Sequence, residues 1–128
     1  MAYISDYGLN WLVGRLATQT ITIGLHTGAP GNAGTANELS SAGARNYARK
    51  AVAASGWSAS GAETDNDDTI TIFTPNAASA GDSVTHVSYW LGSSFFGWAE
   101  LQAPVTTIAS IPFSVAAGTA DFRLARPA

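Results

Sequence analysis

A change of hydrophobic period near the start of the chain most restricts the fold that this sequence can adopt. Between Ser5 and Ala17 the apolar residues recur at helical spacing, and Ser5 or Asp6 can cap the first turn. From Thr18 onward, apolar residues alternate with polar ones, as they do in half-buried strands. No later segment has a credible helical period. The sequence therefore predicts one N-terminal helix followed by a β-structure.

Turn residues divide the rest of the chain into strands. Gly92-Ser93-Ser94 is a hairpin signal between two aromatic strands, and Ala116-Ala117-Gly118 is the predicted turn of a closing strand pair. Pro112 interrupts the first strand of that pair, which indicates an edge strand or a break. The predicted strands span residues 18–27, 49–54, 69–74, 83–91, 95–101, 105–115 and 119–125.

This pattern fits a mainly β fold, namely an antiparallel β-sandwich of jelly-roll-like type with one N-terminal α-helix. Strands do not alternate with helices, so a parallel α/β fold is not expected. A chain of 128 residues has the length of one domain. We therefore expect a single domain over residues 1–128, with the helix in 1–18 and the sandwich in 19–128. The stretches rich in Gly, Ala and Ser are interpreted as loops of that domain: 28–44, 53–62 and 76–82.

A long connection joins two of the predicted strands and reads LHTGAPGNAGTANELSSAGARNYARKAV from Leu25 to Val52. It contains neither a nucleophile–base pair nor a cluster of metal ligands. Gly28, Gly31 and Gly34 recur every three residues, but the GxGxxG fingerprint and the Walker lysine are missing. We interpret these glycines as turn residues. A long loop on a β-scaffold indicates a module that displays a surface for assembly or binding, rather than a reaction centre.

The charge balance argues against nucleic acid as a partner. The net charge is −3, and the six Lys and Arg residues are scattered along the chain. Nucleic-acid binding depends on clustered Lys and Arg that neutralise phosphates. Charged residues make up 12% of the chain, about half of the usual ~25%. Such a neutral surface is common where neighbouring subunits cover it, and a soluble monomer with a Ser- and Thr-rich surface is the alternative.

Cysteine content and hydropathy bear on the compartment. The chain has no cysteine, so it forms no disulfides or thiolate–metal sites, which favours folding in a reducing cytoplasm. The first residues, MAYISDYGLNWLVGRL, lack a basic n-region and include Asp6, so no signal peptide is expected. No apolar run approaches the ~20 residues that span a bilayer, so no membrane insertion is expected.

Acidic residues and histidines are the candidate metal ligands. The run 63–68 could hold a structural Ca²⁺, but Ile70 and Asn76 occupy the positions where an EF-hand needs Gly and Glu. We interpret this run as a solvated turn. His26 and His86 lie opposite the apparent core face and could pair across two strands or reach a subunit interface. A zinc site would need a carboxylate as third ligand, and no GxSxG or HExxH motif accompanies them. We interpret both as structural, and expect no catalytic residue and no cofactor.

Aromatic residues gather on the second predicted hairpin. Alternation places Val87, Tyr89 and Leu91 on one strand face and Trp90 on the other. Outward aromatics would suit a trimer axis or a sugar-stacking platform, and the alternative is that both sheet faces are covered. The aromatic set on the hairpin is Tyr89, Trp90, Phe95, Phe96 and Trp98, and Trp57 lies elsewhere in the sequence.

The order of several short motifs carries a family resemblance. These are LHTGAPG, NEL and NYARKAV within 25–52, THVSYW at 85–90, GWAEL at 97–101 and FSVAAGT at 113–119. In this order they resemble the short single-domain proteins of tailed bacteriophages usually called phage tail fibre proteins. In that family a helix precedes a Leu-His-Thr strand, an Asn-Glu loop, a Tyr-x-Arg step, a Thr-His-x strand and a closing strand pair. The resemblance covers nearly the whole chain, which departs from it at Arg45-Asn46 and at Pro112.

The resemblance implies a non-enzymatic virion structural protein that folds in the bacterial cytoplasm and is incorporated in several copies. A homotrimer is the family-level expectation. The protein would act as a tail tip, an adaptor or a capsid decoration module, with other copies and other phage tail or capsid proteins as partners. The alternative function is a carbohydrate-binding module for host-surface glycans, in which Trp57, Trp90 or Trp98 stacks on sugars. A small hydrolase is a third possibility, for which no acid–base pair is recognisable.

Within this resemblance, roles can be assigned to residues as hypotheses. We expect Glu38 to pair with Arg45 or Arg49, and Tyr47 to anchor the return of the long loop by packing its ring. We expect His86 and Trp90 to lie on an exposed strand face, so that Trp90→Ala would weaken assembly and leave the fold intact. The hypothetical loop-organising residues are His26, Glu38, Tyr47 and Arg49, and the hypothetical interface residues are Trp11, His86, Tyr89, Trp90 and Trp98.

Overall fold

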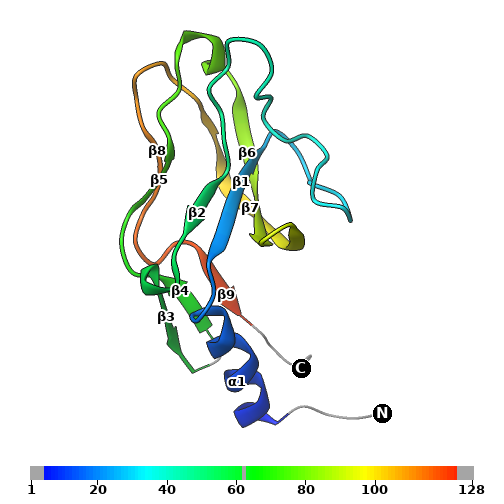
Figure 1. Cartoon of the computed structure of the whole chain (residues 1–128), viewed down its shortest axis with the longest axis vertical. Coiled ribbons are helices and arrows are strands. Elements are labelled where there is room, and N and C mark those ends of the chain that lie inside the picture. The colour runs from blue at the N-terminus through cyan, green and yellow to red at the C-terminus, as the bar shows by residue number, and fades with distance from the viewer. Residues whose placement is uncertain (1–4, 62, 124–128) are drawn as a thin grey trace. The chain divides into compact units, whose positions relative to one another are not determined.

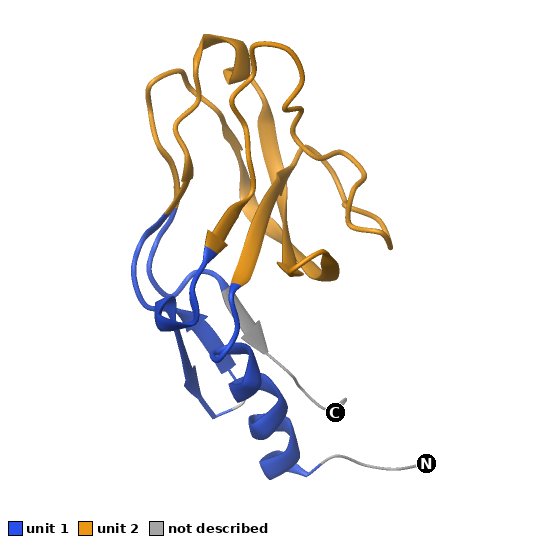
Figure 2. Cartoon of the chain, viewed as in Figure 1, with its two compact units in different colours: residues 1–20, 52–70, 115–128 blue, residues 21–51, 71–114 orange. Residues whose placement is uncertain are grey.

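The computed structural model describes residues 5–61 and 63–123. Within these residues the protein is mainly β, with antiparallel strand pairs and one α-helix, which confirms the predicted fold class. The chain divides into two compact units (Figure 2). The first unit contains residues 1–20, 52–70 and 115–128, and the second contains residues 21–51 and 71–114. The chain passes from one unit to the other four times, after residues 20, 51, 70 and 114. The expected single domain stays a prediction.

Helix α1 (Asp6–Leu16) begins the first unit, and its bounds lie one residue inside the predicted ones. Ser5 caps the helix, because its side-chain oxygen accepts a hydrogen bond from the Gly8 backbone N–H at 3.1 Å. One face of the helix packs against strands β3 and β4 of the same unit. The buried residues on that face are Leu9, Val13 and Leu16.

A three-stranded sheet completes the first unit. Its order is β3 (Trp57–Ser60), β4 (Glu63–Asn66) and β9 (Asp121–Arg123), and the short 3-10 turn η1 (Ala54–Gly56) precedes it. Thr64 is buried and donates a hydrogen bond from its hydroxyl to the Val13 carbonyl at 2.7 Å, which fastens α1 to the sheet. Strands β3 and β4 contradict the prediction, in which residues 53–62 form a loop and 63–68 a turn.

Asn66 fixes the segment that leads into β9. Its side-chain amide donates to the Asp68 carbonyl at 2.8 Å and to the Ala116 carbonyl at 3.0 Å. Its side-chain oxygen accepts a hydrogen bond from the Ala120 backbone N–H at 3.0 Å. One buried side chain therefore holds the turn before β9 onto β4. The predicted closing hairpin is wrong in its pairing, because β9 pairs with β4.

The second unit is built on a four-stranded sheet with the order β2–β1–β6–β7 (Figure 1). The strands are β1 (Ile21–His26), β2 (Lys50–Val52), β6 (Ser83–Leu91) and β7 (Ser94–Thr106). β1 pairs with β6 in antiparallel register, with His26 opposite His86. β6 and β7 form the predicted hairpin, and its turn uses Gly92 with a φ of +62°, a conformation that favours glycine.

A second, two-stranded sheet gives the sandwich its other layer. It consists of β5 (Ile70–Phe73) and β8 (Phe113–Val115), and the 3-10 turn η2 (Ala77–Ser79) follows β5. Figure 1 shows the β5–β8 pair across from the four-stranded sheet. Between them lies the buried apolar core of the second unit, which includes Ile23, Leu25, Ile72, Phe73, Val84, Val87, Tyr89 and Phe113.

The predicted strand 105–115 does not exist as one element. Its first two residues belong to the end of β7, which continues well beyond the predicted end at Leu101. The chain then turns, with a hydrogen bond from the Ile111 N–H to the Ile108 carbonyl, and β8 begins directly after Pro112. Pro112 therefore marks a break, which was one of the two alternatives for this position.

Candidate functional site

The long connection between β1 and β2 is fastened to the end of β1. The Thr27 N–H donates to the Asn37 carbonyl at 2.9 Å, and the Leu39 N–H donates to the Leu25 carbonyl at 3.0 Å. A β-bridge also links His26 to Glu38. These contacts separate the connection into a closed loop, residues 28–36, and a return segment, residues 38–49. We call residues 28–36 the display loop.

The display loop has a fixed conformation at its base and an exposed tip. The Ala36 N–H donates to the Pro30 carbonyl at 3.0 Å, and Asn37, with a φ of +58°, donates from its side chain to the Ala29 carbonyl at 3.0 Å. Gly34 is buried, and a Cβ there would lie 2.2 Å from the ring of Phe95 on β7. Residues 31–33 are exposed. The display loop is therefore supported from the sheet, and its tip is exposed.

Glu38 is the centre of a polar network beneath the return segment. Its two carboxylate oxygens accept hydrogen bonds from Arg49 Nε at 2.7 Å and from Arg49 Nη2 at 2.8 Å, which is a bidentate ion pair. The Tyr47 hydroxyl donates to Glu38 Oε1 at 3.0 Å and accepts a hydrogen bond from the Leu25 N–H at 2.9 Å. The Tyr47 ring packs edge-on against Phe73, with the ring centroids 5.4 Å apart.

Protonation states reinforce this network. Burial opposes ionisation of Glu38, but the hydrogen bonds from Arg49 and Tyr47 outweigh it, so the pKa of Glu38 lies below its ordinary value. The hydrogen bond to Glu38 raises the pKa of Arg49, and burial raises the pKa of the Tyr47 phenol. At neutral pH the ion pair is charged and the phenol keeps the proton that it donates.

His26 joins the display loop to the sheet. Its Nδ1 lies 2.8 Å from the Ala36 carbonyl, which can only accept, so Nδ1 carries the proton. Its Nε2 lies 2.8 Å from the Ser88 hydroxyl, and in the neutral ring this nitrogen accepts. Burial lowers the pKa of His26, which agrees with a neutral ring. Ser88 also accepts a hydrogen bond from the Trp90 indole N–H at 2.9 Å. Both His26 and Ser88 are fully buried.

Trp90 lies beneath Arg49 and does not form an exposed contact surface. The Arg49 guanidinium lies 3.8 Å from the centroid of the Trp90 ring, and the Phe95 ring lies 5.2 Å from it. Only 5% of Trp90 is exposed. The prediction that Trp90 lies on an exposed strand face is therefore wrong. Alternation assigned Trp90 to the correct side of the sheet, but Arg49 and Phe95 cover that side.

The structure brings together all four hypothetical loop-organising residues, His26, Glu38, Tyr47 and Arg49, and Glu38 pairs with Arg49. The hypothetical interface residues differ in how much of each is exposed. Trp11 and Trp98 are exposed at 54% and 49%, and His86 is half-buried, whereas Tyr89 lies in the core with 5% exposed. Burial therefore removes Tyr89 and Trp90 from any contact surface on the folded chain. The interface role of the other three residues stays a prediction.

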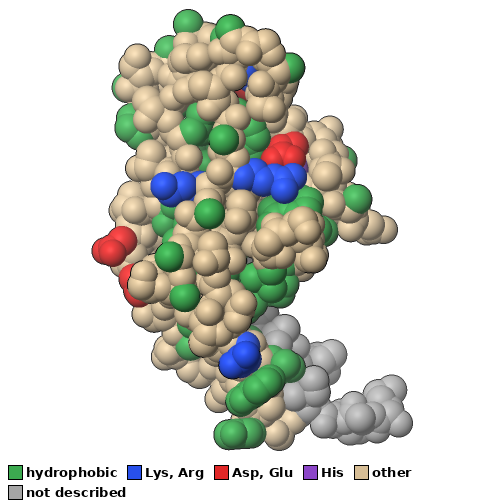
Figure 3. Space-filling view, in the orientation of Figure 1, with side chains coloured by type: hydrophobic (Ala, Val, Ile, Leu, Met, Phe, Trp, Pro, Cys, Tyr) green, Lys and Arg blue, Asp and Glu red, His purple; other side chains and the backbone are tan. Residues whose placement is uncertain are grey.

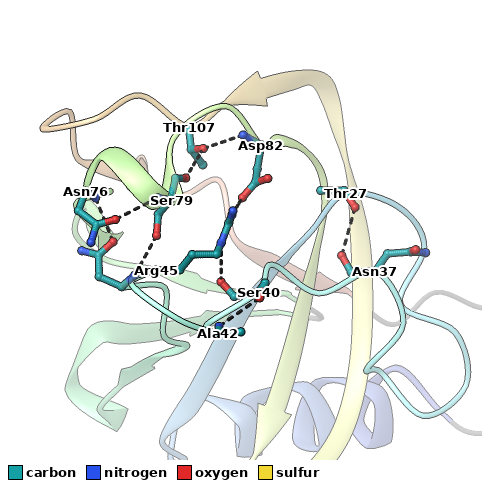
Figure 4. Close-up of polar contacts among 10 residues, drawn as sticks. Thr27, Asn37, Ser40, Ala42, Arg45, Asn76, Ser79, Asp82 and Thr107 are labelled. Atoms are coloured by element: carbon teal, nitrogen blue, oxygen red, sulfur yellow. Dashed lines mark hydrogen bonds and ion pairs between the residues drawn. The ribbon is translucent and has the colours of Figure 1, made fainter.

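A second polar network, which sequence reasoning missed, holds the residues 40–46 of the return segment (Figure 4). Arg45 forms an ion pair with Asp82 and donates from Nε to the Ser40 carbonyl at 3.0 Å. The Asp82 N–H in turn donates to the Thr107 hydroxyl at 3.0 Å. The signal in the sequence was one Arg and one Asp, each in a segment rich in Gly, Ala and Ser (residues 40–46 and 76–82).

Asn76 and Asn46 form the other half of the second network. The Asn76 side chain donates to the Ala44 carbonyl at 2.7 Å. Its side-chain oxygen accepts a hydrogen bond from the Ser79 N–H at 3.0 Å (Figure 4). Its backbone N–H donates to the Asn46 side-chain oxygen at 3.0 Å. Arg45-Asn46, the insertion relative to the Tyr-x-Arg pattern, therefore supplies two of the groups that fix the return segment.

Strand β7 carries the exposed aromatic surface of the second unit. It is an end strand of its sheet, and 49% of Trp98 is exposed on it. The Trp98 ring lies 5.3 Å from the His86 ring at an interplanar angle of 55°. Glu100 is the cross-strand partner of His86. A flat aromatic ring, an imidazole and a carboxylate are thus placed on neighbouring strands.

Other candidate groups are placed away from an open surface. Trp57 is 4% exposed, so of the three tryptophans considered for sugar stacking only Trp98 offers an open ring.

Strand β4 occupies residues 63–66 of the acidic run, and Ser58 hydrogen-bonds Asp67 after it. Within the described residues, no group of three or more His, Asp or Glu side chains could hold a metal ion. No described helix is long and apolar enough to cross a membrane.

Comparison with protein families places most of the chain within one family model. A family model described as "Podophage GP4 fiber I protein gp80" matches residues 2–123, a range that includes all helices and strands within the described residues. No curated protein matches the chain. The match confirms the resemblance to phage tail fibre proteins that the order of motifs indicated.

Proposed function

The chain belongs to the podophage GP4 fiber I protein family, and on that premise we propose that it is a non-enzymatic structural component that assembles in several copies in a podophage fibre. The match over residues 2–123 is the observation that carries the proposal, because it extends over nearly all of the given sequence. His26 and Ser88 are buried and hydrogen-bonded to each other, which supports a structural role for both side chains.

Several features support assembly in more than one copy. Large apolar side chains are exposed at Tyr7, Trp11 and Trp98, and the chain has few charges to keep such surfaces solvated. A trimer is the first symmetry to test, and other tail or capsid proteins are the expected partners. The cysteine-free sequence supports folding in the host cytoplasm before incorporation into the virion.

The solution mass of the purified chain tests this proposal. Light scattering over a dilution series should give a closed oligomer that dissociates only at low concentration. A protein that is a monomer at every concentration would contradict self-assembly. Antibody labelling of purified virions provides the second test, since a fibre component should be present in several copies on each particle.

A second candidate function is glycan binding by the β6–β7 face. The exposed Trp98 ring beside His86 and Glu100 supports it, because sugars stack on aromatic rings while their hydroxyls bond to neighbouring polar groups. Binding should quench tryptophan fluorescence and should be lost in Trp98→Ala. An unchanged signal over a broad panel of host-surface glycans would rule this function out.

A further inference from the structure

Helix α1 has an exposed aromatic face in addition to its buried one. Tyr7 is 79% exposed, Trp11 54% and Leu12 43%. Figure 3 shows apolar side chains gathered over this helix beside a basic one. An amphipathic helix normally presents polar groups on the face that turns away from its own core. The exposed face of α1 therefore has the composition of a contact surface.

Three residues of this face form one row along the helix. Tyr7, Trp11 and Arg15 are spaced four residues apart, so they lie on neighbouring turns. The Arg15 guanidinium lies 5.6 Å from the centroid of the Trp11 ring. The row begins with an aromatic ring, continues with a second ring and ends with a cation. Tyr7 and Arg15 are equally far from Trp11.

We propose that α1 is a self-association surface whose occupant is α1 of a second copy, packed antiparallel with Trp11 at the two-fold axis. In this arrangement Tyr7 lies against Arg15 of the partner subunit at both ends of the row, and each cation meets an aromatic ring. The antiparallel order also opposes the two helix dipoles. A parallel pair would place the two Arg15 side chains together, where like charges repel. The row is thus complementary to itself in one orientation.

This inference rests on the proposed function, because it specifies how copies of the fibre component meet. A two-fold contact cannot close a trimer by itself. It produces either a dimer or a joint between two larger rings. The oligomer should therefore contain an even number of copies.

Cysteine cross-linking tests the contact and its direction, since the chain has no cysteine of its own. Tyr7→Cys and Arg15→Cys are prepared separately, treated with a short thiol–thiol cross-linker alone and as a mixture, and resolved on denaturing gels. The antiparallel contact places position 7 near position 15 of the partner subunit. Two copies of position 7 lie about 12 Å apart along the helices, since eight residues rise 1.5 Å each. We expect cross-linked dimers in the mixture and almost none in either variant alone.

The mixed pair retains one native contact between Tyr7 and Arg15 at the far end of the row, so the substitutions do not remove the whole interface. Cross-linking of each variant with itself, but not in the mixture, would overturn the antiparallel arrangement. Thr35→Cys, at an exposed position of the display loop, measures random collision. Cross-linking in the mixture no stronger than that of Thr35→Cys would overturn the contact.

A pair of variants separates this inference from the proposed function. Trp11→Ala and Ile108→Ala each truncate an apolar side chain of similar exposure. Trp11→Ala should raise the dissociation constant of the oligomer by roughly tenfold or more, with an unchanged circular dichroism spectrum, and Ile108→Ala should leave it unchanged. An oligomer of unchanged stability in Trp11→Ala would overturn the α1 contact and leave the proposed function intact. A wild-type chain that never associates would overturn both.

Discussion

At the scale of single residues, the missing side chain of Gly24 allows the polar network of the second unit to form. A Cβ at this position would lie 2.5 Å from the Ser88 hydroxyl, 3.3 Å from Glu38 Oε1 and 3.4 Å from the Tyr47 hydroxyl. Each of these atoms is held by hydrogen bonds to other groups. The Ser88 hydroxyl would have to move and lose a buried bond, so a side chain at position 24 is disfavoured.

Gly24→Ala should therefore destabilise the protein by about 1–3 kcal/mol, the usual cost of forcing extra volume into a packed site. Gly97→Ala on β7 is the matched control, because a Cβ there meets nothing within 4 Å. Urea unfolding followed by fluorescence measures both. An equal loss of unfolding free energy in the two variants would show that neighbouring side chains move to accommodate a methyl group at position 24 at little cost.

Trp90 shows what strand alternation can and cannot predict. Alternation placed Trp90 opposite Tyr89, but it carries no information on whether a loop residue such as Arg49 covers that face. Trp90→Ala should lower the free energy of unfolding by about 3–5 kcal/mol, since it empties a buried site and removes the ring under Arg49. Trp98→Ala, with its ring half exposed, should change it by less than about 1 kcal/mol. Similar effects from both, measured in urea, would contradict this assignment.

At the scale of elements, the sequence allowed prediction of those whose signals are local. α1 has a capping Ser5 and a helical apolar stripe, and β6 and β7 have an alternating pattern with Gly92 at the turn. β3 and β4 were not predicted because, apart from Trp57, their residues are small or polar. Tertiary hydrogen bonds such as that from Thr64 to Val13 hold these strands in place. The conformation of the return segment could not be predicted either, because Asp82, which pairs with Arg45, lies far away in the sequence.

The junction of β1 with the display loop should make stability depend on pH through His26. Its pKa is lower in the folded chain than the ordinary 6.5, so its contribution is complete above pH 6.5 and is lost as the pH falls through 6.5 toward the folded pKa. Protonated His26 would face Arg49 and His86, with Glu38 as the only opposing charge among the groups that act on it. Urea midpoints should therefore fall between about pH 8 and pH 5.

His26→Asn should lower stability at pH 8 yet flatten this dependence, while His86→Gln should retain it. The Glu38 carboxyl does not contribute to the change in stability between pH 8 and pH 5. Its pKa lies below the ordinary 4.5, so its contribution to stability is lost only as the pH falls below that value. An equally steep dependence in His26→Asn would assign the effect to another group.

At the scale of the whole molecule, both compact units are assembled from segments that are separate in the sequence. Neither can be cut out as one continuous piece. The predicted single domain implies one cooperative unfolding transition. Asn66→Ala, in the first unit, and Gly24→Ala, in the second, should both shift the same calorimetric peak to lower temperature. A peak that splits in Asn66→Ala would mean that the units unfold independently.

The closed base of the display loop also bears on protein engineering. Backbone hydrogen bonds between Thr27 and Asn37 and between Leu39 and Leu25 hold the two ends of the loop together. The exposed residues at its tip therefore contribute little to the stability of the fold. A foreign peptide inserted after Asn32 would lengthen a loop that is already closed, at a cost that grows slowly with its length. With the proposed incorporation in several copies, such an insertion would become a repeated epitope on the particle, so this position suits the display of foreign peptides.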